Sequence, residues 1–426
     1  MYRMNPSAFV LKGIFLDTPA IGELRCREGH ALCEDGVFAG FSSELPAAWA
    51  AFPLHDYTGR LILPGMSDLH LHAPQYSYCG TAMDLQLLDW LQRYTYPEEG
   101  RYRDVGYARQ GYARFTQDLL HSATTRVSIF ATLHTDATLE LMRLLSEAGI
   151  RGYVGKLAMD RNCPDFYREE TGEGLRETRR WLDACAHGEY PGVMPILTPR
   201  FTPSTTDAYM KGLGELSREY GVAAQSHLSE NLDEIRWVSE LCPDTRFYAE
   251  SYSRFGLFGG EQPCVMAHCI YCPEEEDALI RKNGVFIAHC PTSNENVIAG
   301  ISPAARYLRE GYRIGLGSDV AGGHTLNLFA VMAAAVQVSK LRWLYTDKSQ
   351  RPLTIPEALY MATAGGGALF GKVGLFEAGY AFDAIVLDDQ ALLNHLPFTP
   401  AERLERYAYL SDGRPMAKYA AGRKLF

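Results

Sequence analysis

Two histidines, His70 and His72, stand two residues apart shortly after an apolar run. Alternate residues of a strand point to the same face, so both imidazoles can approach one point in space. Neutral imidazole is the commonest metal ligand in proteins, and the pair could supply two ligands to a divalent ion. Two polar residues leaving a strand for solvent would have the same spacing. A metal site therefore requires further ligands elsewhere in the chain.

Further candidate ligands follow four later apolar runs. They occur in QSHLSE, MAHC, AHCPTSN and GLGSDVAGG, and they are His227, His268, His289 and Asp319. Such residues at the ends of four successive runs argue against chance placement. The predicted ligands of one zinc ion are His70, His72, His227 and Asp319. One coordination position would stay open for water.

These residues belong to a long middle part of the chain in which short apolar runs alternate with helical patterns. The eight runs are residues 61–72, 125–132, 152–157, 193–197, 222–227, 264–268, 285–289 and 314–319. Amphipathic stretches such as residues 136–148 and 174–185 lie between them. Eight buried strands alternating with helices predict a (β/α)8 TIM-type barrel over residues 61–380. In this α/β fold the functional residues lie at the carboxyl ends of the strands.

Both ends of the chain have a different pattern, with short β-like runs separated by glycine, proline and acidic residues. Residues 1–60 and 381–426 are predicted to pair into one small domain, a β-sandwich formed by both termini. Residues 76–112 are rich in aromatic side chains. They suit either a lid over the first barrel strand or a contact between subunits.

Composition limits the classes of function. The 426 residues carry a formal net charge of -10, which argues against nucleic acid or an anionic membrane as the main partner. No apolar run reaches the length of a spanning helix, and the start of the chain lacks a signal-peptide pattern. The 10 cysteines at irregular spacings suggest reduced thiols, so we expect a cytoplasmic protein. Cys269 and Cys272 form a C-x-x-C, which could be redox-active or bind metal, but without a second pair ordinary thiols are favoured.

Taken together, these motifs give a sequence that resembles the amidohydrolase superfamily and, within it, the branch that acts on guanine. The resemblance extends from Pro64 through GRKLF at the end of the chain, and so covers essentially the whole chain. PGMSDLHLHAPQ, TPRF, QSHLSEN, MAHC, AHCPTSN and GLGSDVAGG occur in the family's order, and HAPQ and PRF are similar to the guanine branch. There are departures: residues 295–297 read ENV, and His324 follows Gly323. Both departures are expected near the mouth of the pocket.

The resemblance implies one metal per chain. Binuclear relatives bridge two metals with a carbamylated lysine at the end of the fourth strand, where this chain reads LTPRFTP and has no lysine. Lys156, at the end of the third run, is interpreted as a paired structural lysine. We therefore expect one zinc ion, which would lower the pKa of a bound water towards neutrality.

The resemblance also implies roles for individual residues. Glu230, three residues after a predicted ligand, is expected to carry a proton from water to the substrate ring and then to the leaving ammonia. Asp319 would bind the metal and orient the water. His268 would support the charge that develops on the attacked carbon. His289 is interpreted as a structural or supporting residue, and the role of His134 stays open.

Three residues are expected to bind the substrate. Arg200 offers a rigid fork of donors that suits O6 and N7 of guanine, Gln75 offers both a donor and an acceptor, and Phe201 offers a flat apolar face. The implied reaction converts guanine to xanthine and ammonia. A pterin, 8-oxoguanine or a triazine is the alternative substrate, and a non-catalytic relative would be expected to have lost ligands or the glutamate. The expected assembly is a homodimer.

Overall fold

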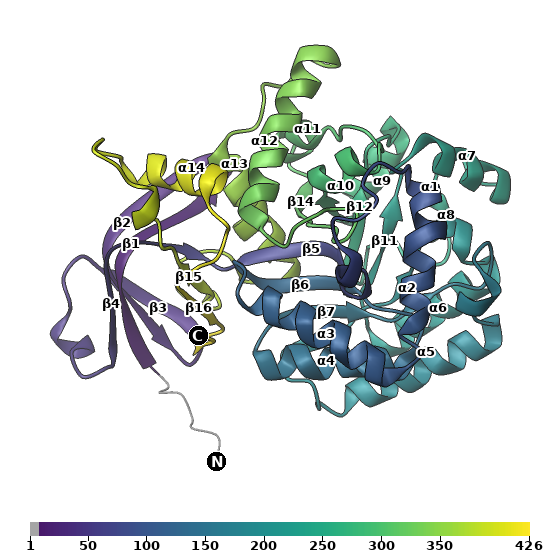
Figure 1. Cartoon of the computed structure of the whole chain (residues 1–426), viewed down its shortest axis with the longest axis horizontal. Coiled ribbons are helices and arrows are strands. Elements are labelled where there is room, and N and C mark those ends of the chain that lie inside the picture. The colour runs from purple at the N-terminus through teal and green to yellow at the C-terminus, as the bar shows by residue number, and fades with distance from the viewer. Residues whose placement is uncertain (1–7) are drawn as a thin grey trace.

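The computed structural model describes residues 8–426. Figure 1 shows a β-rich part that contains segments from both ends of the chain, and a larger part in which helices surround strands. Residues 1–7 belong to the segment from which the absence of a signal peptide was predicted, and they lie outside the described residues. In the described part of the chain, no helix combines the length and the apolar composition needed to cross a membrane.

The larger part contains two parallel sheets of four strands each. The first has the order β5 (Met66–His72), β6 (Thr124–Phe130), β7 (Arg151–Gly155) and β9 (Val193–Pro195). The second has the order β11 (Ala224–Leu228), β12 (Cys264–His268), β13 (Phe286–His289) and β14 (Arg313–Leu316). A short parallel pair, β8 (Leu157–Ala158) and β10 (Thr198–Pro199), extends the strands at the carboxyl end of the first sheet.

Backbone hydrogen bonds join the two sheets at both edges. On one side, Leu197 forms a parallel bridge with Ala224. On the other side, the N–H of Asp319 donates to the carbonyl of His70 at 2.8 Å, and the N–H of His72 donates to the carbonyl of Val320 at 2.7 Å. The sheets therefore close on each other in chain order, which is the arrangement of a TIM-type barrel.

The predicted run 61–72 is two strands rather than one. β4 (Leu54–Pro64) pairs with strands from both ends of the chain in a separate sheet, described below. β5 is a new strand that begins at Met66 and belongs to the barrel. Gly65 stands between them, where a Cβ atom would lie 2.3 Å from the Thr125 hydroxyl oxygen. The close approach of the neighbouring strand therefore requires glycine at the junction.

Helices occupy the connections between the barrel strands, as the alternating pattern predicted. The helices of the described chain are α1 (Leu87–Trp90), α2 (Tyr96–Arg101), α3 (Val105–Leu120), α4 (Thr135–Ala148), α5 (Thr171–Ala186), α6 (Asp207–Tyr220), α7 (Leu232–Leu241), α8 (Glu250–Ser253), α9 (Glu274–Asn283), α10 (Pro291–Asn296), α11 (Ala304–Arg309), α12 (Leu328–Tyr345), α13 (Ile355–Tyr360) and α14 (Pro400–Leu410). α4 buries an apolar stripe that includes Leu141 and Leu145, and it ends at Gly149, whose φ of +80° is left-handed. The amphipathic pattern of the sequence therefore explains where this helix packs, and the glycine explains where it ends.

The terminal sheet has seven strands from both ends of the chain. β1 (Ala8–Ala20), β2 (Glu23–Glu34), β3 (Val37–Ser42) and β4 come from the first part, and β15 (Ala384–Val386), β16 (Ala417–Ala420) and β17 (Arg423–Lys424) from the last. The order is β17-β16-β15-β4-β1-β2-β3, with β15 antiparallel to β4. The predicted pairing of the two ends is therefore present. These strands form one hydrogen-bonded sheet, and the two-layer sandwich stays a prediction.

Candidate active site

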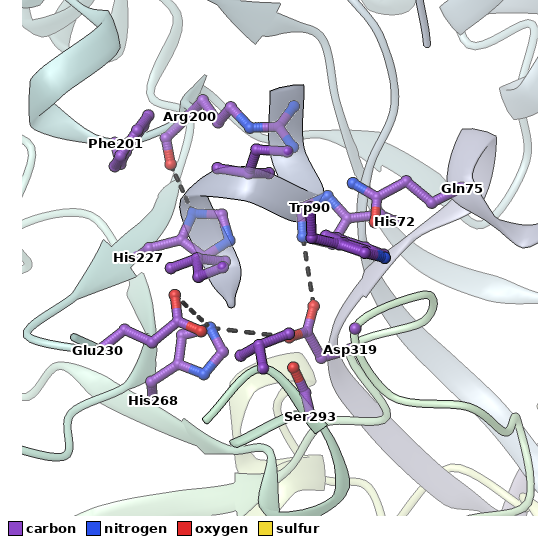
Figure 2. A pocket seen from close by; sticks show the side chains of 14 residues that line it. His72, Gln75, Trp90, Arg200, Phe201, His227, Glu230, His268, Ser293 and Asp319 are labelled. Atoms are coloured by element: carbon purple, nitrogen blue, oxygen red, sulfur yellow. Dashed lines mark hydrogen bonds and ion pairs between the residues drawn. The ribbon is translucent and has the colours of Figure 1, made fainter. Parts of the chain in front are cut away.

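A cavity of about 450 Å³, open to solvent, lies at the carboxyl ends of the barrel strands (Figure 2). Its lining contains most of the predicted site residues. It also contains residues from the aromatic segment and from the loops after β13 and β14. The lining residues are His72, Gln75, Leu87, Trp90, Leu91, Arg200, Phe201, His227, Glu230, His268, Ser293, Val297, Asp319 and Gly322.

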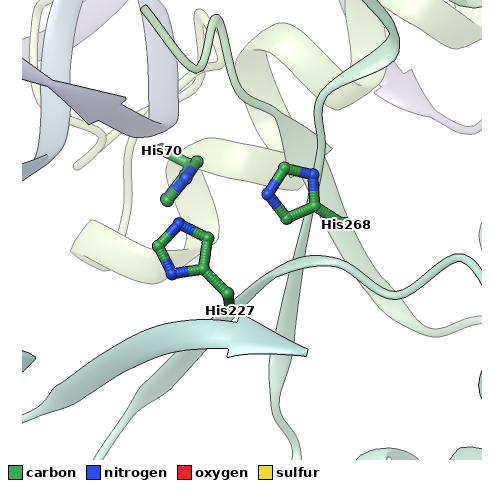
Figure 3. Close-up of side chains that lie close together, drawn as sticks. All are labelled: His70, His227 and His268. Atoms are coloured by element: carbon green, nitrogen blue, oxygen red, sulfur yellow. The ribbon is translucent and has the colours of Figure 1, made fainter. Parts of the chain in front are cut away.

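Histidines and one carboxylate gather at one wall of this cavity. Nε2 of His70 lies 3.1 Å from Oδ1 of Asp319, and Nε2 of His72 lies 3.3 Å from the same oxygen. The ring centroid of His227 is 4.8 Å from that of His70 and 5.4 Å from that of His72. Figure 3 shows the ring of His268 facing the same point, with its centroid 5.5 Å from that of His70. The structure thus brings the four predicted ligands together, with His268 beside them.

Hydrogen bonds behind two of the imidazoles fix which nitrogen faces the cavity. Nδ1 of His227 lies 2.6 Å from the carbonyl oxygen of Arg200, so it carries the hydrogen and leaves Nε2 as the free nitrogen. Nδ1 of His268 lies 2.8 Å from Oδ1 of Asn294, with the same consequence. Metal-binding histidines commonly donate their second N–H in this way.

The cluster suits a divalent cation. Nε2 of His268 is buried and has no hydrogen-bond partner, and Nε2 of His70 is close to Oδ1 of Asp319 without forming a hydrogen bond to it. Burial lowers the pKa of His72 to about 4 and that of His227 well below its ordinary value, so both rings are neutral at pH 7. Neutral imidazoles and an ionised carboxylate are the forms that bind zinc, and a cation would satisfy buried nitrogens that otherwise lack a partner.

Asp319 is held in its ionised form. Burial opposes its ionisation, but contacts with His70 and His72 keep the pKa of this carboxyl well below its ordinary value. The loop after Asp319 packs closely on the neighbouring helix α10. A Cβ atom on Gly322 would lie 2.5 Å from the hydroxyl oxygen of Ser293 and 3.3 Å from Oδ2 of Asp319. A glycine here keeps the space beside the carboxylate open.

Glu230 lies next to this cluster at the start of α7. Oε2 of Glu230 is 3.6 Å from Nε2 of His268. Burial raises the pKa of Glu230 well above its ordinary value, and the charge of Asp319 raises it further. The backbone N–H of Glu230 donates to Glu234, whose carboxylate also completes the capping box of α7. A buried carboxyl with a raised pKa on a fixed backbone suits the transfer of protons.

Two of the predicted substrate-binding residues, Arg200 and Gln75, share a carboxylate that the sequence did not single out. Arg200 donates from Nη1 to Glu99 at 2.6 Å, and Gln75 donates from Nε2 to the other oxygen of Glu99 at 2.7 Å. Glu99 is fully buried, whereas Glu98 beside it is partly exposed. Two adjacent glutamates in an aromatic segment gave no signal to choose between them.

The aromatic segment covers the cavity. Leu87 and Trp90 of α1, together with Leu91 of the following π-helix η3 (Leu91–Thr95), line it from one side. Phe201 lines it from the loop after β10. These contacts agree with the lid interpretation of residues 76–112. They leave the subunit-contact interpretation as a prediction.

Other residues considered from the sequence lie outside the cavity. Lys156 is buried and pairs with Glu169 at 2.6 Å, in agreement with a structural lysine. His134 lines a separate groove near Glu169 and Arg103. His289 is buried behind the site, and neither of its ring nitrogens has a hydrogen-bond partner. No catalytic contact is assigned to either histidine.

Among the cysteines, the thiol of Cys290 lies within 4.8 Å of ligand atoms of His268 and Asp319. All ten cysteines are unpaired thiols. Burial raises the pKa of Cys272 well above its ordinary value, which makes a reactive thiolate unfavourable. Of the two departures from the family pattern, residues 295–297 include Val297, which lines the cavity. His324 lies at the surface, where Nδ1 is 3.2 Å from Nδ2 of Asn296.

Comparison with known proteins shows extended similarity. Residues 61–418 match the amidohydrolase family. A guanine deaminase of Dictyostelium discoideum is 36% identical over 87% of this chain and 83% of its own length. One of Mus musculus is 34% identical over 99% of this chain and 97% of its own. The crystal structure of guanine deaminase from C. acetobutylicum with bound guanine in the active site superimposes on this structure with a TM-score of 0.95. The two sequences are 44% identical, and the match covers 98% of this chain and 100% of the other.

Proposed function

The chain belongs to the amidohydrolase family, and we propose that it hydrolyses guanine to xanthine and ammonia at a site for one zinc ion. The observation that carries this proposal is the arrangement of the cavity. In Figure 2 the hydrogen-bond donors Arg200 and Gln75, here called the donor wall, lie on one side of the cavity, and Asp319 with Glu230 lies on the other. A flat heterocycle between the walls would have its carbonyl edge on the donors and its amino-bearing carbon near the cluster.

The proposed zinc ligands are His70, His72, His227 and Asp319. Their support is the convergence of neutral imidazoles on an ionised carboxylate, together with the buried Nε2 of His70, which forms no hydrogen bond. When bound, zinc lowers the pKa of a water molecule towards neutrality. The pairing of Lys156 with Glu169 supports one metal rather than two, since that lysine is not free to bridge.

Glu230 and His268 are the proposed catalytic residues beside Asp319. Glu230 accepts a proton from the attacking water and gives it to the ring nitrogen next to the attacked carbon. It then takes the second proton from the new hydroxyl group on that carbon and transfers it to the leaving amino group. The new C–O bond replaces the C–N bond, so water and guanine become xanthine and ammonia. His268, held through Asn294, supports the charge on the attacked centre, and Asp319 accepts a hydrogen bond from the water and orients it.

The proposed substrate contacts come from Arg200, Gln75 and Phe201. The guanidinium hydrogens of Arg200 that are not directed at Glu99 would meet O6 and N7 of guanine. Gln75 would donate through its second amide hydrogen, and Phe201 would lie against the ring face. Leu87 and Trp90 would close the cavity over the base and exclude water.

The organisation of the molecule forms part of the same proposal. We assign residues 1–60 with 381–426 to a small β-sandwich domain and residues 61–380 to the barrel. A separate hydrophobic cluster in the terminal sheet, which includes Phe15 and Tyr419, supports this division. Exposed apolar side chains at the end of α12, such as Tyr345 at 83% exposure, support a homodimer. The unpaired cysteines support a reducing, cytoplasmic location.

Ammonia release from a panel of bases tests the proposed reaction. The zinc-loaded protein is given guanine, 8-oxoguanine, adenine, cytosine and pterin, and initial rates are measured. Guanine is expected to have the highest kcat/KM, with xanthine as the product. A faster reaction with pterin would reject guanine as the substrate and leave a hydrolase of another amino-heterocycle. No ammonia from any base would reject the reaction itself.

A further inference from the structure

Glu99 is a buried carboxylate that contacts both polar residues of the donor wall but is not itself part of the cavity lining. Its side chain is 0% exposed, and that of Arg200 is 3% exposed. Oε2 of Glu99 accepts from Arg200 at 2.6 Å, and Oε1 accepts from Gln75 at 2.7 Å. Each oxygen of one carboxylate therefore holds a different substrate-facing side chain.

The first consequence concerns the amide of Gln75. Its oxygen accepts the backbone N–H of Ala321 at 3.2 Å, and its nitrogen donates to Glu99. Both ends of the amide are fixed, and the amide cannot flip without losing both bonds. The hydrogen left for a ligand is an N–H. Glu99 therefore makes Gln75 a donor.

The second consequence concerns charge. A buried guanidinium without a partner is costly and would attract an anion. Among the residues that the structure describes, Glu99 is the carboxylate in ion-pair contact with Arg200. Its negative charge offsets the arginine, so the donor wall offers hydrogen bonds with little net positive charge.

We propose that Glu99 is a positioning residue that makes the donor wall select neutral purines and reject anionic ones. This inference rests on the proposed function. Guanine is neutral near pH 7, whereas xanthine, which has a second ring carbonyl in place of the amino group, loses a ring N–H proton more readily. Compensation of Arg200 by Glu99 would thus weaken the binding of the xanthine anion and help the product to leave.

The position of Glu99 in the chain connects this role to the cover of the cavity. Glu99 lies on α2, which follows η3 and α1, and the preceding elements supply Leu87, Trp90 and Leu91. π-helical turns are frequent at functional sites. The bonds from Arg200 and Gln75 to Glu99 therefore also anchor the segment that covers the base.

The first test compares Glu99→Gln with Glu98→Gln in the zinc-loaded protein. Glu98 has a similar set of contacts, to Arg101 and to the Tyr107 hydroxyl, but is separate from the donor wall. Loss of a charged hydrogen-bond partner predicts a KM for guanine raised about 10- to 100-fold in Glu99→Gln, with a smaller change in kcat. In Glu99→Gln, the ratio of the xanthine inhibition constant to the guanine KM should be lower than in wild type. The difference should grow as pH rises, because more of the xanthine is then ionised. Glu98→Gln should leave all three values at wild-type level.

Two outcomes would overturn the inference. One is an unchanged ratio of the xanthine inhibition constant to the guanine KM in Glu99→Gln. The other is the same change in Glu98→Gln. Glu99→Asp keeps the negative charge but shortens the side chain. It should raise the KM for guanine and still reject xanthine at high pH.

A second measurement needs no variant and separates this inference from the proposed reaction. Binding of hypoxanthine, a neutral purine, and of urate, an anion near pH 7, is measured on the zinc-loaded wild-type protein by calorimetry. Hypoxanthine is expected to bind at least about tenfold more tightly. Equal or tighter binding of urate would reject charge selection even if guanine is deaminated. A failure to deaminate guanine with this preference intact would reject the reaction alone.

Discussion

Nδ1 of His227 lies 2.6 Å from the backbone carbonyl of Arg200, so one hydrogen bond joins a predicted metal ligand to the residue predicted to bind the substrate. The carbonyl of Arg200 orients the imidazole, while its side chain extends to the donor wall and Glu99. A displacement of this residue would therefore affect both walls of the cavity. Its side chain can still be changed separately, because the contact with the imidazole is made by the backbone.

Metal content is the first prediction. Purified protein is expected to hold one zinc per chain, because the ligand cluster has one carboxylate and three neutral imidazoles and lacks a bridging lysine. Exhaustive chelation should remove activity, and added zinc should restore it. Elemental analysis with parallel activity measurements checks this. Two tightly bound metals per chain, or full activity without metal, would contradict it.

Replacement of the proposed proton carrier is the second prediction. Glu230→Gln keeps the shape of the side chain and removes its ability to accept a proton. Groups of this kind typically contribute about 100- to 10,000-fold, so kcat should fall by that order with zinc content unchanged. Rapid-mixing kinetics and metal analysis are made on the same preparation. Wild-type turnover in a zinc-loaded variant would show that Glu230 has another role.

Substrate selection by the arginine is the third prediction. Arg200→Lys should lose much of the guanine activity, since one ammonium cannot form two parallel hydrogen bonds, while zinc content stays the same. Adenine presents a donor in place of one acceptor at the same edge, and discrimination at such a site can reach about 10,000-fold. Kinetics of both enzymes with both bases measure this. Normal guanine kinetics in Arg200→Lys would contradict the assigned contact.

The buried lysine at the junction of sheet and barrel gives the fourth prediction. Burial lowers the pKa of Lys418 to about 7, and its Nζ lies 3.0 Å from the carbonyl oxygens of Leu119 and Leu120. Between this value and the ordinary lysine pKa of about 10.4, the unfolded chain binds more protons than the folded chain. The contribution of Lys418 to the free energy of unfolding should therefore rise with pH, by up to about 1.4 kcal/mol per pH unit. Below pH 7 its unfavourable contribution is fully present.

Urea unfolding of wild type and Lys418→Met from pH 6 to pH 9 measures this dependence. The stability of wild type relative to the variant should increase with pH above about 7. Lys424→Met, at an exposed position of β17, is the matched control and should show no such trend. A flat difference for Lys418→Met would mean that the buried amine stays protonated.

Strand-end residues were predictable because their spacing reflects the geometry of a parallel barrel. His268 is the last residue of β12 and His227 the last but one of β11, so both lie at strand ends as predicted. Asp319 was placed in a strand that in fact ends at Leu316, and its φ of +46° belongs to the turn that follows. The motif located the residue correctly, although the local backbone is not extended there.

Glu99 was not predictable, for a physical reason. Its function depends on burial between residues far away in the sequence, and no periodicity of its own segment records those partners. It is 24 residues from Gln75 and 101 from Arg200. A single sequence indicates which side chains can do chemistry at a strand end. It does not indicate which distant carboxylate holds them.

The hydrogen bond from Asp319 to His70, together with that from Ser318 to Asp68 across 250 residues, has a consequence for biosynthesis. The bonds join the first barrel strand to the segment after the last one. During translation, the histidines of β5 must wait until residue 319 has left the ribosome before the four-ligand set can form. A metal held by this set would therefore bind late, when most of the barrel has been synthesised. It would stabilise the contact between the first barrel strand and the segment after the last one.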